Sequence, residues 1–244
     1  MIPIKLCGIT RRQDAELAVE LGAAAIGIIL AASPRRITPE QARIILKTVP
    51  PTVDKVGVFV NLSPAAIRPI AEQIGLTVVQ LHGTEPPEWV AELAQDYKTI
   101  KTVKLSMTGT ECPAGARCPA GTRCPAGTEC PPDIAIYPGW RILLEPRVPG
   151  ADGGTGQRFD WNLLDRIDLS RCLIGGGIRP DNLPELLDRF QSMNRIPAGI
   201  DVCSGVESAP GIKDPDKMKH LFSLIRDYVW PRNKDVETVN RDAP

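Results

Sequence analysis

The stretch IKLCGIT, residues 4 to 10, places a cysteine at the end of an apolar run and a glycine directly after it. If this run is a β-strand, Lys5 and Cys7 share one of its faces. A second run, AGIDVCSG, places Asp201 and Cys203 on one face in the same way. A lysine near Cys7 favours the thiolate, the form that can remove a proton. The competing interpretation is a packed core thiol, because free cysteine is among the most buried residue types.

Three glycine-rich stretches occur in the later part of the chain: DGGTG at 152–156, GGG at 175–177 and CSG at 203–205. Backbone N–H groups exposed at such glycines hold a phosphate, above all beside a helix N-terminus. Ordinary turn chemistry explains one such stretch more easily than three. The pattern therefore predicts a phosphate site formed by these three stretches, with Gly153 and Gly154 in the first of them.

The elements that must position these residues follow from the alternation of short β-rich runs with helical patterns. Eight strand-then-helix units with one helix missing are the number expected of a (β/α)8 TIM barrel, which belongs to the α/β class. A doubly wound sheet of five or six strands would not use all eight of these strand-then-helix units. In a closed barrel the eighth strand lies beside the first, so Lys5 and Asp201 are expected in adjacent inward positions. Both folds place their sites at the carboxyl ends of the strands.

The fifth helix is the missing one, because residues 112–130 repeat a Cys-Pro-Ala-Gly pattern that does not form a regular helix. One interpretation of Cys112, Cys118, Cys124 and Cys130 is a metal or disulfide module. Five residues separate each cysteine from the next, whereas zinc ligands are usually paired two to four residues apart. We therefore favour a surface loop without a required ligand. The predicted organisation is a single barrel domain over residues 1–229, with an irregular insertion at 106–133, and a flexible C-terminal tail at 230–244.

The composition argues against several classes of protein. Lys and Arg total 29, as do Asp and Glu, so no overall field attracts nucleic acid or an anionic membrane surface. The longest apolar stretch, residues 23–32, is about half of the roughly 20 residues that cross a bilayer. The N-terminus does not resemble a secretion signal. We expect a cytoplasmic protein with reduced thiols, without a metal and without a nucleic-acid or membrane partner.

Six motifs together resemble one family of enzymes. They are KLCGIT, SPRRITPEQA, VGVFVN, VVQLHG, GGTGQRFDW and DVCSGVE, and they lie in the right order and spacing from about residue 3 to residue 228. The family that the chain resembles is phosphoribosylanthranilate isomerase of tryptophan biosynthesis. The resemblance implies an Amadori rearrangement without a cofactor, from N-(5-phosphoribosyl)anthranilate to 1-(2-carboxyphenylamino)-1-deoxyribulose 5-phosphate. It leaves open whether the chain is a monomer or a homodimer.

The resemblance also implies roles for particular residues. Cys7 matches the general base that takes the C2 proton, and Arg35 matches the arginine that holds the anthranilate carboxylate. Asp201 matches the aspartate that helps to hold the ribose. Gln80 and His82 belong to the motif that lines the barrel mouth beside the substrate, although a structural role for His82 fits equally well. The family's phosphate glycines match Gly176, Gly177 and Gly205, together with Ser204.

The general acid departs from the family's pattern. The family has an aspartate at the end of the sixth strand, where this chain has Glu145. A partly dry barrel mouth would raise the pKa of Glu145 and keep it protonated. Its extra methylene moves the proton by about one bond length, and a misplacement of ~1 Å can cost about a hundredfold in rate. Asp152, in a loop that could close over the substrate, is the alternative acid, and we favour Glu145.

Two other functions compete with the isomerase. One is another phosphosugar barrel enzyme, such as an indole-glycerol-phosphate synthase. Such enzymes lack a cysteine base after the first strand, and the synthase would need lysine and glutamate at several strand ends. The other is a barrel that binds a phosphorylated ligand without turning it over. The substitution at the acid position keeps this last interpretation open.

Overall fold

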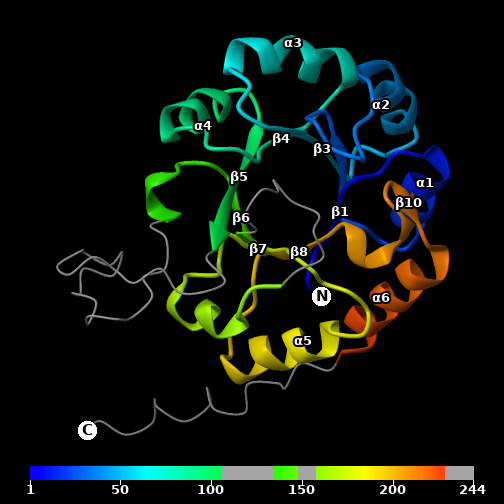
Figure 1. Cartoon of the computed structure of the whole chain (residues 1–244), viewed down its shortest axis with the longest axis vertical. Coiled ribbons are helices and arrows are strands. Elements are labelled where there is room, and N and C mark those ends of the chain that lie inside the picture. The colour runs from blue at the N-terminus through cyan, green and yellow to red at the C-terminus, as the bar shows by residue number, and fades with distance from the viewer. Residues whose placement is uncertain (106–133, 148–157, 229–244) are drawn as a thin grey trace, which may run out of the picture.

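The computed structural model describes residues 1–105, 134–147 and 158–228. Its eight parallel strands form a closed barrel in chain order, with the eighth strand paired to the first, and the helices lie outside the ring (Figure 1). This confirms the predicted (β/α)8 fold. The strands are β1 (Ile4–Leu6), β2 (Ala25–Ile29), β3 (Asp54–Phe59), β4 (Val78–Leu81), β5 (Lys98–Leu105), β6 (Arg141–Pro146), β7 (Cys172–Ile174) and β8 (Gly199–Val202).

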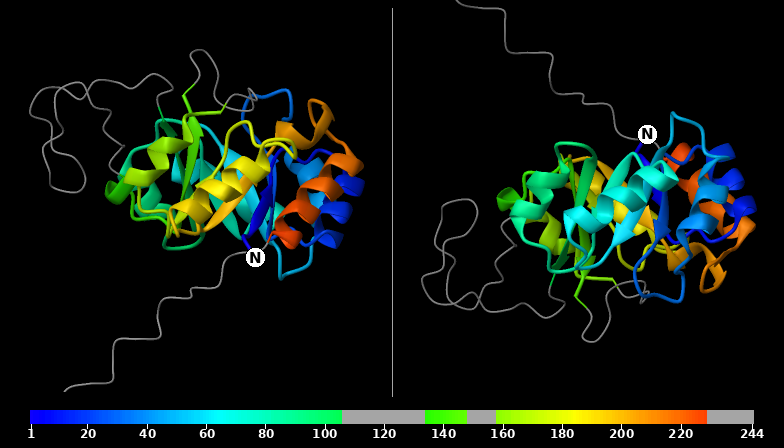
Figure 2. Two further views of the ribbon diagram at one scale, coloured as in Figure 1. Left: turned by 90° about the horizontal axis from the view of Figure 1, so that it is seen from below. Right: turned by 90° about the horizontal axis from the view of Figure 1, so that it is seen from above.

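The outer layer consists of helices that follow the strands (Figure 2). The α-helices are α1 (Arg12–Glu20), α2 (Pro39–Leu46), α3 (Pro64–Ile74), α4 (Pro87–Leu93), α5 (Leu183–Ser192) and α6 (Pro215–Asp227). Three 3₁₀ helices, η1 (Ile134–Ile136), η2 (Trp161–Arg166) and η3 (Ser204–Val206), and a small hairpin of β9 (Glu207–Ala209) and β10 (Ile212–Lys213) complete the described elements. Between β5 and β6, the part of the chain that the structure describes contains one helix, η1. The predicted cysteine-repeat insertion and the C-terminal tail lie outside the described residues.

Local sequence signals set the ends of several helices. Thr38 caps α2: its side chain accepts a hydrogen bond from the Gln41 backbone N–H, and the Gln41 side chain accepts one from the Thr38 N–H. This reciprocal pair satisfies two N–H groups that have no partner within the helix. Pro39 occupies the first turn, where its missing N–H costs nothing. Gly75 ends α3 with a φ of 71°, a left-handed conformation that glycine adopts without a steric penalty.

The barrel interior changes from apolar to polar along the strands. Val56, Val78, Ile100, Leu143 and Leu173 form a closed cluster of buried side chains. Because side chains alternate along a strand, the next inward positions after three of them are Gln80, Thr102 and Glu145, at the carboxyl ends of β4, β5 and β6. Apolar side chains therefore fill the barrel interior at the amino ends of the strands, and polar side chains line it at their carboxyl ends.

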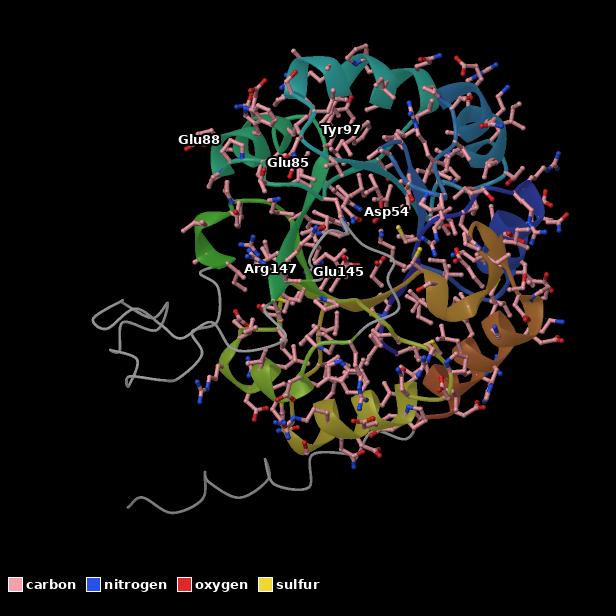
Figure 3. All side chains as sticks on the ribbon, viewed as in Figure 1. Asp54, Glu85, Glu88, Tyr97, Glu145 and Arg147 are labelled. Carbon is pink, nitrogen blue, oxygen red and sulfur yellow. The ribbon has the colours of Figure 1, made fainter. Side chains whose placement is uncertain are left out.

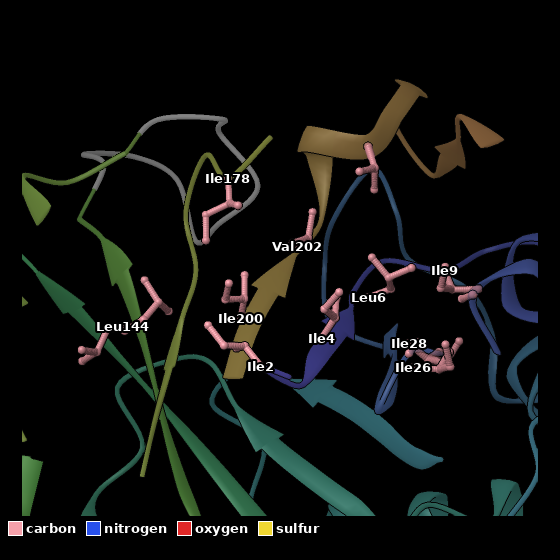
Figure 4. Packing of buried hydrophobic residues seen from close by; sticks show 14 of the residues in the cluster. Ile2, Ile4, Leu6, Ile9, Ile26, Ile28, Leu144, Ile178, Ile200 and Val202 are labelled. Carbon is pink, nitrogen blue, oxygen red and sulfur yellow. The ribbon is translucent and has the colours of Figure 1, made fainter. Parts of the chain in front are cut away.

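The main core lies between the strands and the helices. Ile4 and Leu6 of β1 pack with Ile200 and Val202 of β8 in this layer (Figure 4). Each side chain of this size contributes ~1.5–3 kcal/mol when fully buried, so this layer stabilises the scaffold that holds the mouth. None of the described helices is long and apolar enough to span a membrane.

Candidate active site

The first and eighth strands bring two predicted site segments together. Lys5 is paired in register with Asp201, and the Lys5 Nζ lies 2.5 Å from an Asp201 carboxylate oxygen. Both side chains are buried, with 3% and 4% of their surface exposed. The expected adjacent inward positions are thus observed, and the two charges form an ion pair beneath the mouth.

Cys7 stands directly above this ion pair. Its backbone N–H donates to the Val202 carbonyl, and its side chain is 5% exposed. A hydrogen bond from the Cys203 thiol lowers the pKa of Cys7 well below its usual range, and the positive charges of Lys5 and Lys213 add to this effect, whereas burial opposes it. Cys7 is therefore disposed to be a thiolate, the form that acts as a base.

Glycine at position 27 makes room for this sulfur. A carbon added at Gly27 would lie 2.9 Å from the Cys7 Sγ and 3.0 Å from the Cys7 Cα. Gly27 belongs to β2, which pairs with β1 on the side opposite β8. The Cys7 sulfur therefore occupies the space beside Gly27, and a side chain at position 27 would displace it.

Glu145 projects into the ring of strands from β6 (Figure 3). One of its carboxylate oxygens lies 3.2 Å from the Nε2 of His82, and both residues are 9% exposed. Burial alone would raise the pKa of Glu145, but the charge and hydrogen bond of His82 lower it below its usual value. This differs from the protonated carboxyl expected from the sequence, because the sequence does not show that the His82 ring contacts this oxygen.

The contact between Glu145 and His82 favours a protonated imidazole. Burial opposes a charged ring, yet the Glu145 carboxylate and the Cys7 sulfur raise the pKa of His82. The other ring nitrogen, Nδ1, lies 2.9 Å from the amide nitrogen of Gln80 and 3.0 Å from the Thr102 hydroxyl. Within the described residues, the buried Oε1 of Gln80 has no partner. An amide turned by 180° would let that oxygen accept a hydrogen bond from the Nδ1–H group, as a charged ring requires.

Arg35 forms a buried ion pair with Glu207. Its Nε and Nη2 donate to the two carboxylate oxygens at 2.8–3.1 Å. Lys213 donates to the same carboxylate at 3.0 Å and to the Cys203 carbonyl at 2.9 Å. Glu207 stood in the DVCSGVE motif without an assigned role, and nothing in the local sequence pattern indicates Lys213. Together the two residues fix the Arg35 guanidinium beside the end of β8.

The predicted phosphate glycines that follow β7 and β8 come close together. Gly176 and Gly177 have φ values of 83° and 62°, a region that side-chain-bearing residues rarely adopt. Gly205, in η3, approaches so closely that an added carbon would lie 1.8 Å from the Ile178 carbonyl oxygen. Ser204 begins the same 3₁₀ helix. Gly153, Gly154 and the alternative acid Asp152 lie outside the described residues.

The charged groups of β1 and β8 interact electrostatically with Glu145 of β6. Burial raises the pKa of Asp201 to about 7, with Cys7 and Glu145 raising it and Lys5 lowering it. Lys5 in turn lowers the pKa of Glu145. Asp201 is therefore within range of both the sulfur and the carboxylate, although its closest partner is Lys5. Perturbed groups gathered at one mouth are typical of catalytic sites. The described residues contain no group of three or more potential metal ligands.

A closed (β/α)8 barrel with polar groups at the carboxyl ends of its strands has the architecture of the barrel enzymes. The model of the N-(5'-phosphoribosyl)anthranilate isomerase family matches residues 4–113 and 141–223. The chain belongs to this family.

Individual relatives agree with this assignment. The N-(5'-phosphoribosyl)anthranilate isomerase of Desulforudis audaxviator is 36% identical over 228 residues, which cover 93% of this chain and 99% of the relative. The crystal structure of the isomerase from Thermus thermophilus is 35% identical with a TM-score of 0.75, and the match covers 93% of this chain and 99% of that one. A second solved structure, an isomerase in complex with reduced 1-(o-carboxyphenylamino)-1-deoxyribulose 5-phosphate, is 33% identical with a TM-score of 0.70, and the match covers 93% of this chain and 100% of that one.

Proposed function

We propose that Cys7 and Glu145 are the base and the acid with which this chain isomerises N-(5-phosphoribosyl)anthranilate. The activity is that of its family, an aldose-to-ketose Amadori rearrangement in tryptophan biosynthesis. The observation that supports these roles is the shared mouth: a sulfur at the end of β1 with a lowered pKa and a carboxylate of β6 paired with a histidine. The reaction needs one group to give a proton and one to take it.

The first step opens the ribose ring. A proton passes to the ring oxygen, the bond between C1 and that oxygen breaks, and the anthranilate nitrogen forms the double bond of a Schiff base. We assign the delivery of this proton to Glu145, which receives it from the His82 imidazole at 3.2 Å. His82 thus serves as the proton store, a role that the VVQLHG motif did not suggest.

The second step transfers a proton from C2. The Cys7 thiolate takes it, and the electrons of the C–H bond move toward the nitrogen, which gives an enolamine that becomes the ketose. Lys5 and the Cys203 thiol stabilise the thiolate in the resting state. The charge of Lys5 is shared with Asp201, so the thiolate stays basic enough to accept the proton.

The remaining residues hold the two ends of the substrate. The hydrogen bonds to Glu207 use the Nε and Nη2 of Arg35, and we assign the Nη1 group to the anthranilate carboxylate. We assign the phosphate to the backbone at Gly176, Gly177, Ser204 and Gly205, and the predicted partners Gly153 and Gly154 lie outside the described residues. We assign Asp201 and Gln80 to the ribose; Asp201 accepts a hydrogen bond from Lys5, and the Gln80 amide contacts His82.

Replacing Arg35 with glutamine is expected to raise KM about 10- to 100-fold, with a smaller change in kcat. Hydrogen bonds to a charged group contribute about 1.5–3 kcal/mol, and binding that is equal in ground and transition states appears in KM. Steady-state kinetics measure this effect. Arg36→Gln is the matched control, because Arg36 is exposed and is expected to change KM less. Equal effects of the two variants would contradict the assignment of Arg35.

Replacing Gly205 with alanine is expected to destabilise the protein by about 1–3 kcal/mol, as overpacking usually does. The variant should also lose the stabilisation that inorganic phosphate gives against urea. Gly75→Ala is the control for the phosphate response: its φ of 71° makes alanine costly there too, but Gly75 lies at the end of α3, away from the mouth, so this variant should lose stability and keep the stabilisation by phosphate. A Gly205→Ala variant with unchanged stability and phosphate response would contradict the proposed phosphate site.

All the residues assigned here come from one chain, so the site is complete in a single protomer, whether the protein is a monomer or a homodimer. The three cysteines in the described ranges are free, and reduced thiols are the rule in the cytoplasm. We place the enzyme there, with a small-molecule phosphosugar as its substrate.

The function is tested by adding the purified protein to freshly prepared phosphoribosylanthranilate and following the fluorescence of the substrate. The proposal predicts a loss of fluorescence that is proportional to enzyme concentration and faster than the spontaneous decay. Decay at the spontaneous rate, in a protein that still binds inorganic phosphate, would instead support a barrel that binds without turnover.

A further inference from the structure

A second cysteine lies against Cys7 at the mouth. The register that pairs Lys5 with Asp201 and Leu6 with Val202, continued by one residue, places Cys7 opposite Cys203. The Sγ of Cys203 leans toward the end of β1, since a carbon added at Gly8 would lie 2.9 Å from it. Cys203 is also the largest influence that lowers the pKa of Cys7, as expected of a thiol close to the Cys7 sulfur.

This placement is compatible with a covalent bond between the sulfurs. Neighbouring strands lie ~4.7–4.9 Å apart, and disulfides join residues whose Cα atoms are about 4.4–6.8 Å apart. Cys203 is partly exposed and Cys7 is buried. A small oxidant that reaches the mouth therefore meets both sulfurs in one place.

The chemistry of the pair is asymmetric. The hydrogen bond and the cations beside Cys7 favour its thiolate, whereas the hydrogen bond to Cys7 and burial raise the pKa of Cys203 and keep it protonated. A thiolate is the nucleophile in thiol oxidation, and a sensor cysteine typically has a second thiol close by. Cys7 has the first property and Cys203 provides the second.

We propose that Cys7 and Cys203 form a reversible disulfide when the enzyme meets a peroxide. The Cys7 thiolate attacks one peroxide oxygen, the O–O bond breaks, and the products are a sulfenic acid at Cys7 and hydroxide. The Cys203 sulfur then attacks the sulfenic sulfur, its proton leaves with the departing oxygen as water, and the S–S bond forms. The sulfurs are oxidised by two electrons in total and the peroxide is reduced.

The consequence for catalysis rests on the proposed function. A disulfide removes the thiolate that takes the C2 proton, so the oxidised enzyme is inactive until a thiol reduces it. The bond also protects Cys7 from further oxidation to sulfinic acid, which ordinary thiols do not reverse. Cys203 would therefore convert an irreversible loss of the base into a reversible one.

Cys172 provides a matched control within the same fold. It lies on β7 with 0% of its surface exposed, and its thiol donates to the Asp168 carbonyl at 3.1 Å. Burial and the nearby Asp168 raise its pKa to about 12. Cys172 is expected to resist a dose of peroxide that oxidises Cys7.

The test is to treat the full-length protein with hydrogen peroxide, block the free thiols, digest it with trypsin and measure the masses without reduction. Each sulfur lies in its own tryptic peptide, residues 6–11 for Cys7 and residues 196–213 for Cys203. We expect these peptides to be joined, with the loss of two hydrogens, and to separate after dithiothreitol. The repeat cysteines lie in other peptides and do not interfere.

Variants complete the test. Cys203→Ser is expected to stop at a Cys7 sulfenic acid that reacts with dimedone, and to reach sulfinic acid with more peroxide. Cys172→Ala should give the same joined peptides as the parent protein. The proposal is overturned if peroxide oxidises Cys7 without joining the two peptides, or if Cys203→Ser protects Cys7 from sulfinic acid as well as the parent does. These experiments measure peptide masses and not enzyme activity, so they test the disulfide even if Cys7 proves not to be the base.

Discussion

A Cys7→Ala variant is expected to keep its fold and lose about two to four orders of magnitude in kcat, the usual contribution of a general base. The methyl group of alanine leaves the neighbouring Lys5–Asp201 ion pair in place but cannot take the C2 proton. Cys7→Ser should be nearly as inactive, because a serine hydroxyl is not ionised at neutral pH. Steady-state turnover of phosphoribosylanthranilate measures both variants.

The control for Cys7→Ala is Cys172→Ala, which removes a buried thiol from β7, away from the predicted roles. It is expected to lower stability and to retain near-parental kcat. Stabilisation by inorganic phosphate should persist in Cys7→Ala, which separates loss of chemistry from loss of the phosphate end. A Cys7→Ala variant with near-normal kcat would show that another group removes the proton.

Glu145→Gln is expected to lower kcat by a similar factor of about 10² to 10⁴, because the amide has no proton to give at this pH range. The amide also loses the negative charge that raises the pKa of His82. In the parent enzyme, kcat/KM should rise with pH as Cys7 ionises and fall as the His82–Glu145 pair loses its proton. The raised pKa of His82 places that fall above the ordinary range of a histidine.

The pH profile therefore distinguishes the acid from a residue that merely lines the mouth. Glu145→Gln should retain the ascending limb, which reports Cys7, and lose the descending one. The two limbs are properties of coupled groups rather than of single side chains. An unchanged bell-shaped profile at full rate would exclude Glu145 and direct attention to Asp152.

Glu145→Asp separates an active enzyme from a barrel that has lost its acid. The shorter side chain moves the carboxyl away from His82 by about one bond length, and ~1 Å of misplacement can cost about a hundredfold. We therefore expect the parent to be active and Glu145→Asp to be slower. An inactive parent that gains activity from Glu145→Asp would favour the binding-only interpretation.

The architecture was predictable because its signals are local. The alternation of strands and helices depends on residues close in sequence, and the structure confirms it. The pairing of Lys5 with Asp201 was predictable for a further reason. Once eight strands close a barrel, the first and last are neighbours and only the register remains to be fixed.

The electrostatics of the mouth were less predictable, because they depend on contacts between distant segments. The state of Glu145 is set by the His82 ring 63 residues earlier in the chain, and no spacing rule relates the two. Likewise, Glu207 orients Arg35 across 172 residues. The family resemblance named the reacting positions, whereas these partners required the folded chain.

A crystal structure of this protein with reduced 1-(o-carboxyphenylamino)-1-deoxyribulose 5-phosphate bound would test the central claim directly, since Cys7 and Glu145 must act on one sugar. We predict the Cys7 sulfur within ~3–3.5 Å of C2, the Glu145 carboxyl at the oxygen that came from the ring, and the phosphate on the backbone at Gly177 and Gly205. A ligand with its C2 away from the sulfur, or with Asp152 at the oxygen in place of Glu145, would contradict the account.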